Sequence, residues 1–273
     1  MIRDITLGQY FPSDSFLHRM DPRAKILLAV SFVVVIFLAK TLLAYVLVLA
    51  ALGAIIALSK VSLKFYLKGL KPLLFLMCFT AVLNMLYSPG TPLFSFWVFS
   101  VSAEGIVSAV YMVLRIMLMV VSMSVLTYTT SPLLLTGGLE RLLSPLGYLH
   151  VPVHDFAMMM TIALRFIPTL LEETEKIMSA QKARGADFES GSLVRRAKAL
   201  VPILIPLFVS AFRRAEDLAV AMECRCYDTD GVTRTRYVEY RFTYRDGVAA
   251  LAIILLIIAV VLLDRVTVWG GLL

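Results

Sequence analysis

Long apolar runs alternate with polar segments along the chain. Because a helix needs about 20 apolar residues to cross a hydrocarbon core roughly 30 Å thick, each long run is a candidate membrane span. The first two runs meet at Lys40, which favours two helices joined by a tight turn over one continuous helix. The pattern therefore predicts five transmembrane helices, over residues 24–39, 41–59, 70–88, 104–128 and 247–264.

A different pattern fills residues 131–246, where apolar positions recur at helical spacing among many charged ones. The first helix of this region is predicted to end near Gly185, since glycine tolerates a left-handed C-terminal turn. Its predicted covered face consists of Ile167, Leu170, Leu171, Thr174, Ile177, Met178 and Gln181. A second run, LVPILIPLFVSAFRRAEDLAVAMECRCYD, has the same pattern of an apolar start followed by amphipathic spacing. It carries a ridge of small residues, on which another helix can cross closely. The predicted inner face consists of Phe208, Ala211, Ala215, Leu218, Ala219 and Met222, and the ridge is Ala211, Ala215 and Ala219.

Together these patterns predict an all-α polytopic membrane protein with about five transmembrane helices and two long amphipathic cytoplasmic helices. The predicted division is an N-terminal arm with four spans over 1–130, a cytoplasmic helical region over 131–246, and a C-terminal span over 247–273. Residues 89–103, with the aromatic stretch LFSFWVFS, are expected as a loop at the outer interface. Residues 61–74, with regularly spaced lysines, predict a surface helix that leads into the third span.

Composition and charge place the protein in a lipid bilayer and orient it there. Hydrophobic residues make up 60% of the 273 positions and charged residues 16%, which is more apolar surface than one soluble core of this length hides. The net charge of +7 needs no nucleic acid, because the basic residues concentrate in segments predicted to be cytoplasmic. This bias predicts a cytoplasmic N-terminus and an external C-terminus. Arg115, inside the fourth span, is expected to face protein rather than lipid.

Each amphipathic helix is predicted to end in a tip made of a small residue, an arginine and another small residue. The first tip is Ala183, Arg184 and Gly185, followed by Asp187, and the second tip is Cys224, Arg225 and Cys226, followed by Asp228. In one interpretation the arginines only complement helix C-termini, where a cation is favoured by about 0.3–1 kcal/mol, and the aspartates are surface partners. In the other, each arginine is a slim knob that enters an acidic pocket of another protein and makes bidentate contacts. The duplication favours the second interpretation, with two sockets on a two-part partner.

Candidate chemistry within the chain is sparse. No glycine-rich loop ends in Gly-Lys-Ser or Gly-Lys-Thr, so the usual phosphate-binding loop for ATP is missing. His150 and His154 are four residues apart without a third ligand nearby, so neither a metal nor a resident cofactor is predicted. The rival function, a membrane-embedded enzyme acting on a lipid-linked substrate, has one candidate group. This group, Glu172, Glu173 and Glu175, fans around a helix as a solvated face does.

Three stretches of the sequence resemble the signature stretches of the EcfT family, which includes the CbiQ-type proteins. They are GQYFPSDSFLHRMDPRAK near the start, ALRFIPTLLEETEKIMSAQKARGAD and RRAEDLAVAMECRCYDTDGVTRTRY. Members of that family are transmembrane scaffolds of energy-coupling factor importers in prokaryotic plasma membranes. The resemblance implies a non-catalytic chain that joins two ABC-type ATPases, which use the ATP, to a substrate-binding membrane subunit that captures a vitamin or micronutrient.

The resemblance also implies a role for the two tips. Arg184 and Arg225 are each expected to plug into a groove of one ATPase subunit. The slim shoulders beside them are Ala183, Gly185, Cys224 and Cys226. The second tip reads Cys-Arg-Cys, where the family commonly has Ala-Arg-Gly or similar. Cysteine is small enough to stand beside the arginine, but Cys226 lacks the backbone freedom of glycine. The sequence therefore does not specify the conformation of the turn after the second helix.

Overall fold

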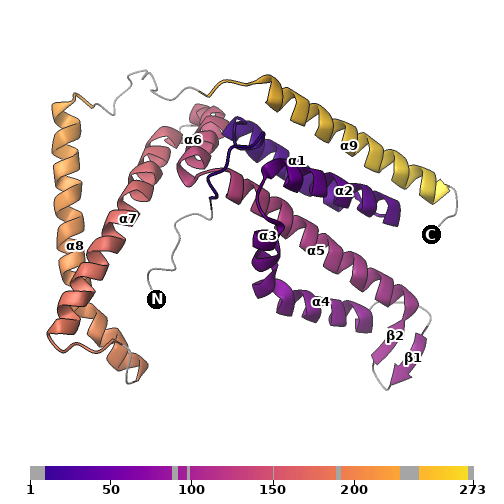
Figure 1. Cartoon of the computed structure of the whole chain (residues 1–273), viewed down its shortest axis with the longest axis horizontal. Helices are drawn as coiled ribbons and strands as arrows, with labels where there is room; N and C mark the ends of the chain where they lie inside the picture. Colours follow the sequence, from indigo (N-terminus) through magenta and orange to yellow (C-terminus); the bar gives the residue numbers. More distant parts are fainter. Residues whose placement is uncertain are drawn as a thin grey trace. The chain divides into compact units, whose positions relative to one another are not determined.

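The computed structural model describes residues 10–87, 92–96, 99–149, 151–188, 192–227 and 240–269. The chain forms two compact units (Figure 1). One unit, called the bundle here, contains residues 8–153 and 240–273. The described part of the other unit lies within residues 154–239 and is called the helix pair. The predicted division at residues 130 and 246 concerns the roles of the segments. The compact units do not test it, so it stays a prediction.

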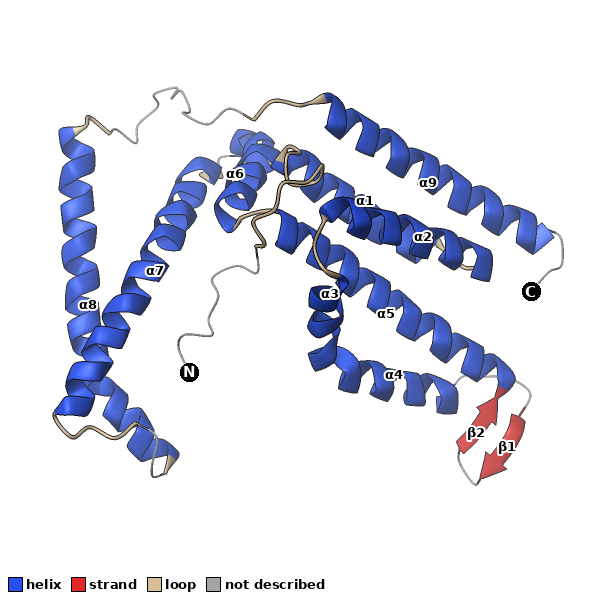
Figure 2. Ribbon diagram, in the orientation of Figure 1, coloured by secondary structure: helices blue, strands red, loops and turns tan. Residues whose placement is uncertain are grey.

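Helices make up almost all of the described chain (Figure 2). The elements of the bundle are α1 (Pro22–Leu38), α2 (Leu42–Ser59), α3 (Leu63–Leu70), η2 (Lys71–Leu73), α4 (Leu74–Tyr87), β1 (Pro92–Phe96), β2 (Phe99–Ser102), α5 (Ala103–Thr129), α6 (Pro132–Leu143), η3 (Ser144–Leu149) and α9 (Tyr244–Trp269). The helix pair is formed by α7 (Val153–Ala183) and α8 (Leu193–Cys224). The two strands pair antiparallel, with Phe96 opposite Phe99, in a segment that the sequence predicted as a loop. The predicted fold class, an all-α polytopic membrane protein, is confirmed with this short hairpin added.

Among the described residues, four helical stretches are long and apolar enough to cross a bilayer. They are Leu42–Ser59, Leu63–Leu86, Ala103–Thr129 and Tyr244–Val266. The predicted first span forms α1, whose 17 residues put it at the short end of the range for a spanning helix. The predicted count of five therefore becomes four full-length candidates and this shorter helix. The predicted surface helix and third span are α3 and α4, which change direction at the turn η2 around Pro72 (Figure 1).

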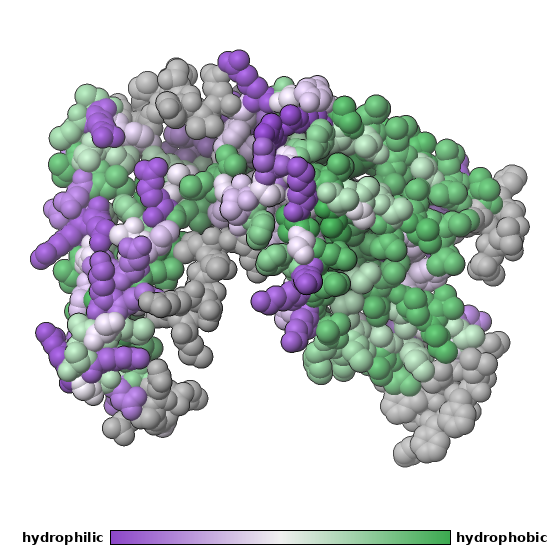
Figure 3. Space-filling model, in the orientation of Figure 1, coloured by the Kyte–Doolittle hydropathy of each residue, from purple (hydrophilic) through white to green (hydrophobic). Residues whose placement is uncertain are grey.

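The face of the bundle seen in Figure 3 is mostly apolar, whereas the helix pair displays many hydrophilic side chains. Large apolar side chains of α4 and α9 point outward, and Phe75 is 82% exposed. An exposed apolar surface of this extent is typical of a membrane-facing region rather than of a soluble protein. The outward face of the bundle is therefore suited to lipid contact.

The core of the bundle lies between α1, α2, α5 and α9, and Arg115 of α5 is directed into protein as predicted. Its Nε donates a hydrogen bond to the hydroxyl oxygen of Tyr45 at 3.0 Å. Its guanidinium carbon lies 5.9 Å from the ring centre of Phe37 and 6.0 Å from that of Tyr45. The fully buried residues of this core include Val35, Ile36, Val48, Leu118 and Val260. The arginine thus has aromatic and hydrogen-bonding partners in place of lipid.

Two aspartates that the sequence analysis did not single out join the ends of the bundle helices. Asp246, at the start of α9, accepts a hydrogen bond from the backbone N–H of Asp21 at 3.0 Å. Asp21 in turn caps α1 by accepting from the N–H of Arg23 at 2.9 Å. At the far end of α9, Asp264 accepts from the N–H and the hydroxyl of Thr41 at 3.2 and 2.7 Å, where α2 begins. Both ends of α9 are therefore fastened to earlier helices.

Candidate functional site

Helix α7 presents the covered face that its sequence predicts. All seven residues of that face are partly buried, namely Ile167, Leu170, Leu171, Thr174, Ile177, Met178 and Gln181. The charged residues Glu172, Lys176 and Lys182 are exposed. The prediction is confirmed because the apolar positions recur at helical spacing, so that they gather on one side of the helix.

Helix α8 presents a covered face that differs from the predicted one. Ile203 is its most buried residue, and the stripe continues through the half-buried residues Leu207, Ser210, Ala211, Arg214, Leu218 and Met222. Of the predicted inner face, Ala211, Leu218 and Met222 lie on this stripe, whereas Phe208, Ala215 and Ala219 are exposed. Residues four apart advance by about 40° per step around an α-helix, so a row of them turns away from a straight contact line. The predicted inner face is therefore wrong for Phe208, Ala215 and Ala219.

The two helices of the pair run antiparallel and are joined by polar contacts. Near their crossing, Arg214 Nη2 donates to Glu173 Oε2 at 2.9 Å. A hydrogen bond from Ser210 and the adjacent Arg214 guanidinium lower the pKa of the Glu173 carboxyl. Further along, the hydroxyl of Tyr227 donates to the sulfur of Met158 at 2.8 Å. Because Tyr227, just after the end of α8, contacts Met158 early in α7, the C-terminal ends of the two helices lie at opposite ends of the pair (Figure 1).

The first tip closes α7 with a defined pair of backbone hydrogen bonds. The N–H of Ala186 donates to the carbonyl of Gln181 at 3.0 Å, and the N–H of Gly185 donates to the carbonyl of Lys182 at 3.0 Å. Gly185 has a φ of +87°, the left-handed conformation that this C-terminal motif requires. In this motif Arg184 is the residue between the last helical residue, Ala183, and the left-handed Gly185.

The second tip repeats the same pair of bonds at the end of α8. The N–H of Tyr227 donates to the carbonyl of Met222 at 2.9 Å, and the N–H of Cys226 donates to the carbonyl of Glu223 at 2.8 Å. Cys226 takes the glycine position with a φ of +54°. The structure therefore answers the question that the sequence raised, because the second helix ends in the same turn without glycine.

Both tips present an arginine with little bulk beside it. Arg184, Arg225 and their four shoulder residues are all exposed, and the two shoulder cysteines are free thiols. A guanidinium offers five N–H donors in a plane, which matches a carboxylate or a polar groove in two-point contacts. Asp187 is exposed beside the first tip, whereas Asp228 lies outside the described residues. The geometry suits insertion of each tip into a narrow acidic socket.

The other groups considered in the sequence do not gather into a reactive centre. Glu172 is exposed, Glu173 pairs with Arg214, and Glu175 is half-buried on α7. Within the described residues no group of three or more His, Cys, Asp or Glu side chains could hold a metal ion. His154 is exposed, and His150 lies outside the described residues. The glutamates are therefore explained by helix pairing and solvation.

Comparison with known proteins places this architecture in a family. A family model described as cobalt transport protein, CbiQ, matches residues 13–237. A protein of Brevibacillus brevis named energy-coupling factor transporter transmembrane protein EcfT is 52% identical, over 95% of this chain and 98% of the relative. The chain belongs to the EcfT family. Proteins of the same name from Clostridium kluyveri and Lactococcus lactis are 48% and 45% identical, over 99% and 97% of this chain and the whole of each relative. Both the bundle and the helix pair lie within these EcfT matches.

Proposed function

We propose that this EcfT chain is the transmembrane scaffold of an energy-coupling factor importer, and that Arg184 and Arg225 dock its ATPase subunits. The observation that carries the proposal is the repeated tip, in which the same backbone turn presents an exposed arginine between small residues. A cation at a single helix end is explained by the helix dipole alone. Repetition of the whole turn, with a strained residue tolerated in one copy, supports a shared binding task.

The spacing of the tips supports two separate sockets. Tyr227, beside the second tip, contacts Met158 near the start of α7. From Met158 to Arg184 the helix rises by about 39 Å at about 1.5 Å per residue. One small socket cannot receive both arginines at that distance, whereas two ATPase subunits side by side can. The proposed partners are therefore two ABC-type ATPases, which bind and use the ATP.

The contacts of the helix pair supply a route for mechanical coupling. When ATP draws the two ATPases together, the two tips move with their sockets. The bond between Glu173 and Arg214 lies at the crossing, so motion of one helix is passed to the other. Helix α7 follows the bundle element η3 along the chain, and α8 is followed by α9. In this mechanism the chain transmits motion to the membrane spans and carries out no chemistry itself, so no cofactor of its own is needed.

The arrangement of the bundle supports the proposed topology in the cell membrane of a prokaryote. Ser13 donates to the carbonyl of Ser59 at the end of α2, and the N–H of Phe11 donates to the carbonyl of Tyr128 at the end of α5. These contacts, and the bond between Asp21 and Asp246, bring the N-terminal arm and one end of the bundle together. Basic residues concentrate in these segments, which favours a cytoplasmic N-terminus.

A substrate-binding membrane subunit is the remaining partner in this proposal. Its task is to capture a vitamin or micronutrient, and the identity of that substrate is set in the other subunit. The apolar outer surface of the bundle supports contact with a second membrane protein as well as with lipid. The alternative of a membrane-embedded enzyme finds no support, since Glu173 is engaged by Arg214 and the matches are to EcfT proteins.

The test is affinity purification of the tagged chain from its native membrane in mild detergent. The variant carries Arg184→Ala and Arg225→Ala, and the matched control is Arg213→Ala, an exposed arginine on α8 away from the tip. Wild type and control are expected to retain two ATPase subunits and ATP hydrolysis, and the double variant to lose both while remaining monodisperse. Retention of full ATPase yield by the double variant refutes the docking role.

A further inference from the structure

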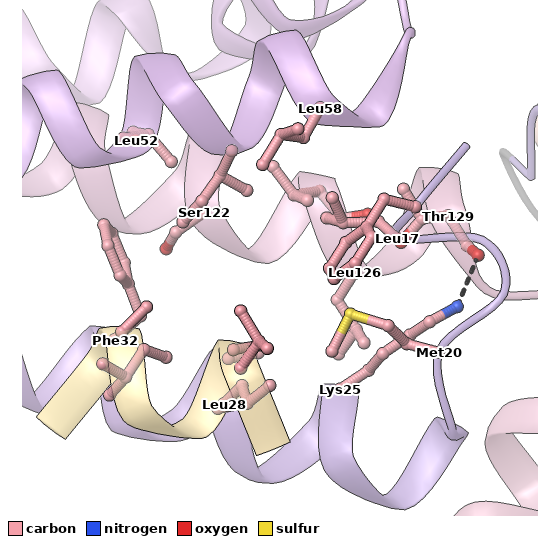
Figure 4. Close-up of a pocket in the computed structure, with 18 residues that line it drawn as sticks. Leu17, Met20, Lys25, Leu28, Phe32, Leu52, Leu58, Ser122, Leu126 and Thr129 are labelled. Atoms are coloured by element: carbon pink, nitrogen blue, oxygen red, sulfur yellow. Dashed lines mark hydrogen bonds between the residues drawn. The ribbon is translucent and has the colours of Figure 1, made fainter. Parts of the chain in front are cut away.

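A cavity of about 420 Å³ lies among the helices of the bundle and opens at its surface (Figure 4), since the lining residues Leu58 and Val248 are exposed. Its walls come from α1, α2, α5, α9 and the segment just before α1. It occupies the half of the bundle where α1 and α9 begin and α2 and α5 end. All but three of its 18 lining residues are apolar, and Leu28, Phe32 and Leu52 surround the space in Figure 4.

The three polar lining residues have their hydrogen bonds elsewhere. Lys25 is 7% exposed, and its Nζ donates to the carbonyls of Thr129 at 3.0 Å and His18 at 3.3 Å. The hydroxyls of Ser122 and Thr129 each donate to a backbone carbonyl of α5 at 2.8 Å. A buried water needs two to four polar partners, and an apolar cavity of about 150 Å³ stays dry and takes up benzene. This larger cavity is therefore suited to an apolar occupant.

A polar pocket of about 330 Å³ adjoins the cavity at the end of the bundle. Phe16 lines both spaces, and the guanidinium carbon of Arg245 lies 5.8 Å from the centre of its ring. The remaining lining residues of the polar pocket are Asp14, Ser15, Arg19, Lys60 and Tyr244. A space suited to an apolar chain and a space lined by three cations are thus neighbours.

The charge of the polar pocket is positive at neutral pH. Arg19 forms an ion pair with Asp14. This hydrogen bond, and the nearby charges of Lys60 and Arg245, lower the pKa of the Asp14 carboxyl, which is therefore ionised. Three cations against one carboxylate leave a net charge of +2. Such a pocket attracts an anionic group.

We propose that the two adjoining pockets bind one anionic phospholipid, with its phosphate among Arg19, Lys60 and Arg245 and one acyl chain in the cavity. A phospholipid carries an anionic head next to an apolar chain, and here the polar pocket lies next to the cavity, with Phe16 lining both. Basic pockets between membrane helices bind anionic headgroups in this way. Under the proposed topology the lipid comes from the cytoplasmic leaflet. The site is independent of Arg184 and Arg225, so ATPase docking and lipid binding succeed or fail separately.

The headgroup is tested by native mass spectrometry of the full-length chain in detergent. Phosphatidylglycerol and phosphatidylcholine with identical acyl chains are titrated in parallel. One phosphatidylglycerol per chain is expected to bind about thirtyfold more tightly, because each basic residue contributes about fivefold and the net charge is two. The triple variant Arg19→Gln, Lys60→Gln, Arg245→Gln is expected to lose this preference. The control Lys64→Gln, Lys68→Gln, Lys71→Gln, three exposed lysines outside both pockets, is expected to keep it.

The cavity is tested by filling it from α9. Ala249→Phe places a ring in the cavity and is expected to lower binding of both lipids at least tenfold, whereas Leu255→Phe, at an exposed position outside it, is expected to change neither. Thermal unfolding midpoints of all variants show that they are folded. Equal binding of the two lipids to the wild-type chain means annular lipid only and overturns the proposal. Selective binding that survives the triple variant or Ala249→Phe also overturns it.

Discussion

The two tips have the same backbone and different residues. Both close with the same two hydrogen bonds, but the left-handed position is Gly185 in the first tip and Cys226 in the second. For a residue other than glycine this conformation costs roughly 1–2 kcal/mol. The comparison shows that the turn defines the tip, and that the hydrogen bonds of the helix end hold even a strained residue in it. If the turn serves docking, the two tips are equivalent in binding and unequal in local stability.

The largest expected effect tests equivalence in binding. Arg184→Ala and Arg225→Ala are each expected to weaken the affinity of purified ATPase subunits for the reconstituted chain by about 2–5 kcal/mol, or about thirtyfold to several thousandfold. The reason is that each change leaves an acidic socket without its cation. Titration of labelled ATPase against each variant measures the loss. A large loss of ATPase affinity in one variant and none in the other contradicts the equivalence of the two tips in binding.

A chemical difference between the tips allows selective blocking. Cys224 and Cys226 are exposed thiols, and the first tip contains none. A charged, membrane-impermeant maleimide is expected to reach them and to reduce ATPase binding as much as Arg225→Ala does, because the adduct widens the slim shoulder. Cys78 lies in α4, inside a predicted span, and is expected to stay unlabelled.

The matched control for the labelling is the double variant Cys224→Ala, Cys226→Gly, which keeps a small-Arg-small tip without thiols. It is expected to bind ATPase before and after the reagent. Full ATPase binding by the labelled wild-type chain shows that the second tip does not enter a narrow socket.

Local stability is expected to separate the tips by a smaller amount. Gly185→Ala puts a side chain at a φ of +87° and is expected to destabilise the first turn by about 1–2 kcal/mol. Cys226→Gly relieves the same strain, but the freer unfolded chain offsets roughly 0.4–1 kcal/mol of the gain. Hydrogen exchange of the amides of Ala186 and Tyr227 measures both changes. Opposite signs in the two tips support the comparison, and equal signs contradict it.

The smallest expected effect concerns the ion pair between Glu173 and Arg214, which joins α7 to α8. Because the pKa of Glu173 is lowered from its ordinary value of 4.5, the native state holds the proton less tightly than the unfolded chain. The contribution of the pair is complete above pH 4.5 and is lost as pH falls through the lowered pKa. Glu173→Gln is expected to remove this dependence, because glutamine does not titrate. Hydrogen exchange of the α8 amides near Arg214, corrected for intrinsic rates, is then expected not to change with acid.

Glu172→Gln is the control, because Glu172 is exposed on the same helix. It is expected to leave the acid dependence in place. Since the Glu173 and Arg214 side chains are 23% and 38% exposed, their pair contributes little stability in either case. An acid response that is unchanged in Glu173→Gln assigns the dependence to another group.

Features that depend only on residues close together in the sequence could be predicted from the sequence. The apolar runs located the membrane helices, and the helical spacing located the covered face of α7. The small-Arg-small tips were also visible as local strings. The α8 face was misjudged because a four-residue repeat alone does not show which side meets α7, and Ala215 and Ala219 turn outward.

Sequence alone determined that the chain is a membrane protein with an amphipathic helical region and two arginine tips, because hydropathy and helical periodicity are properties of short windows. Tertiary structure decided which distant groups meet. Glu173 and Arg214 are 41 positions apart, and Asp246 meets the Asp21 backbone across 225 positions. The cavity with its basic neighbour was likewise formed by segments from both ends of the chain. Such contacts depend on how whole helices pack, and no local pattern of residue types specifies that packing.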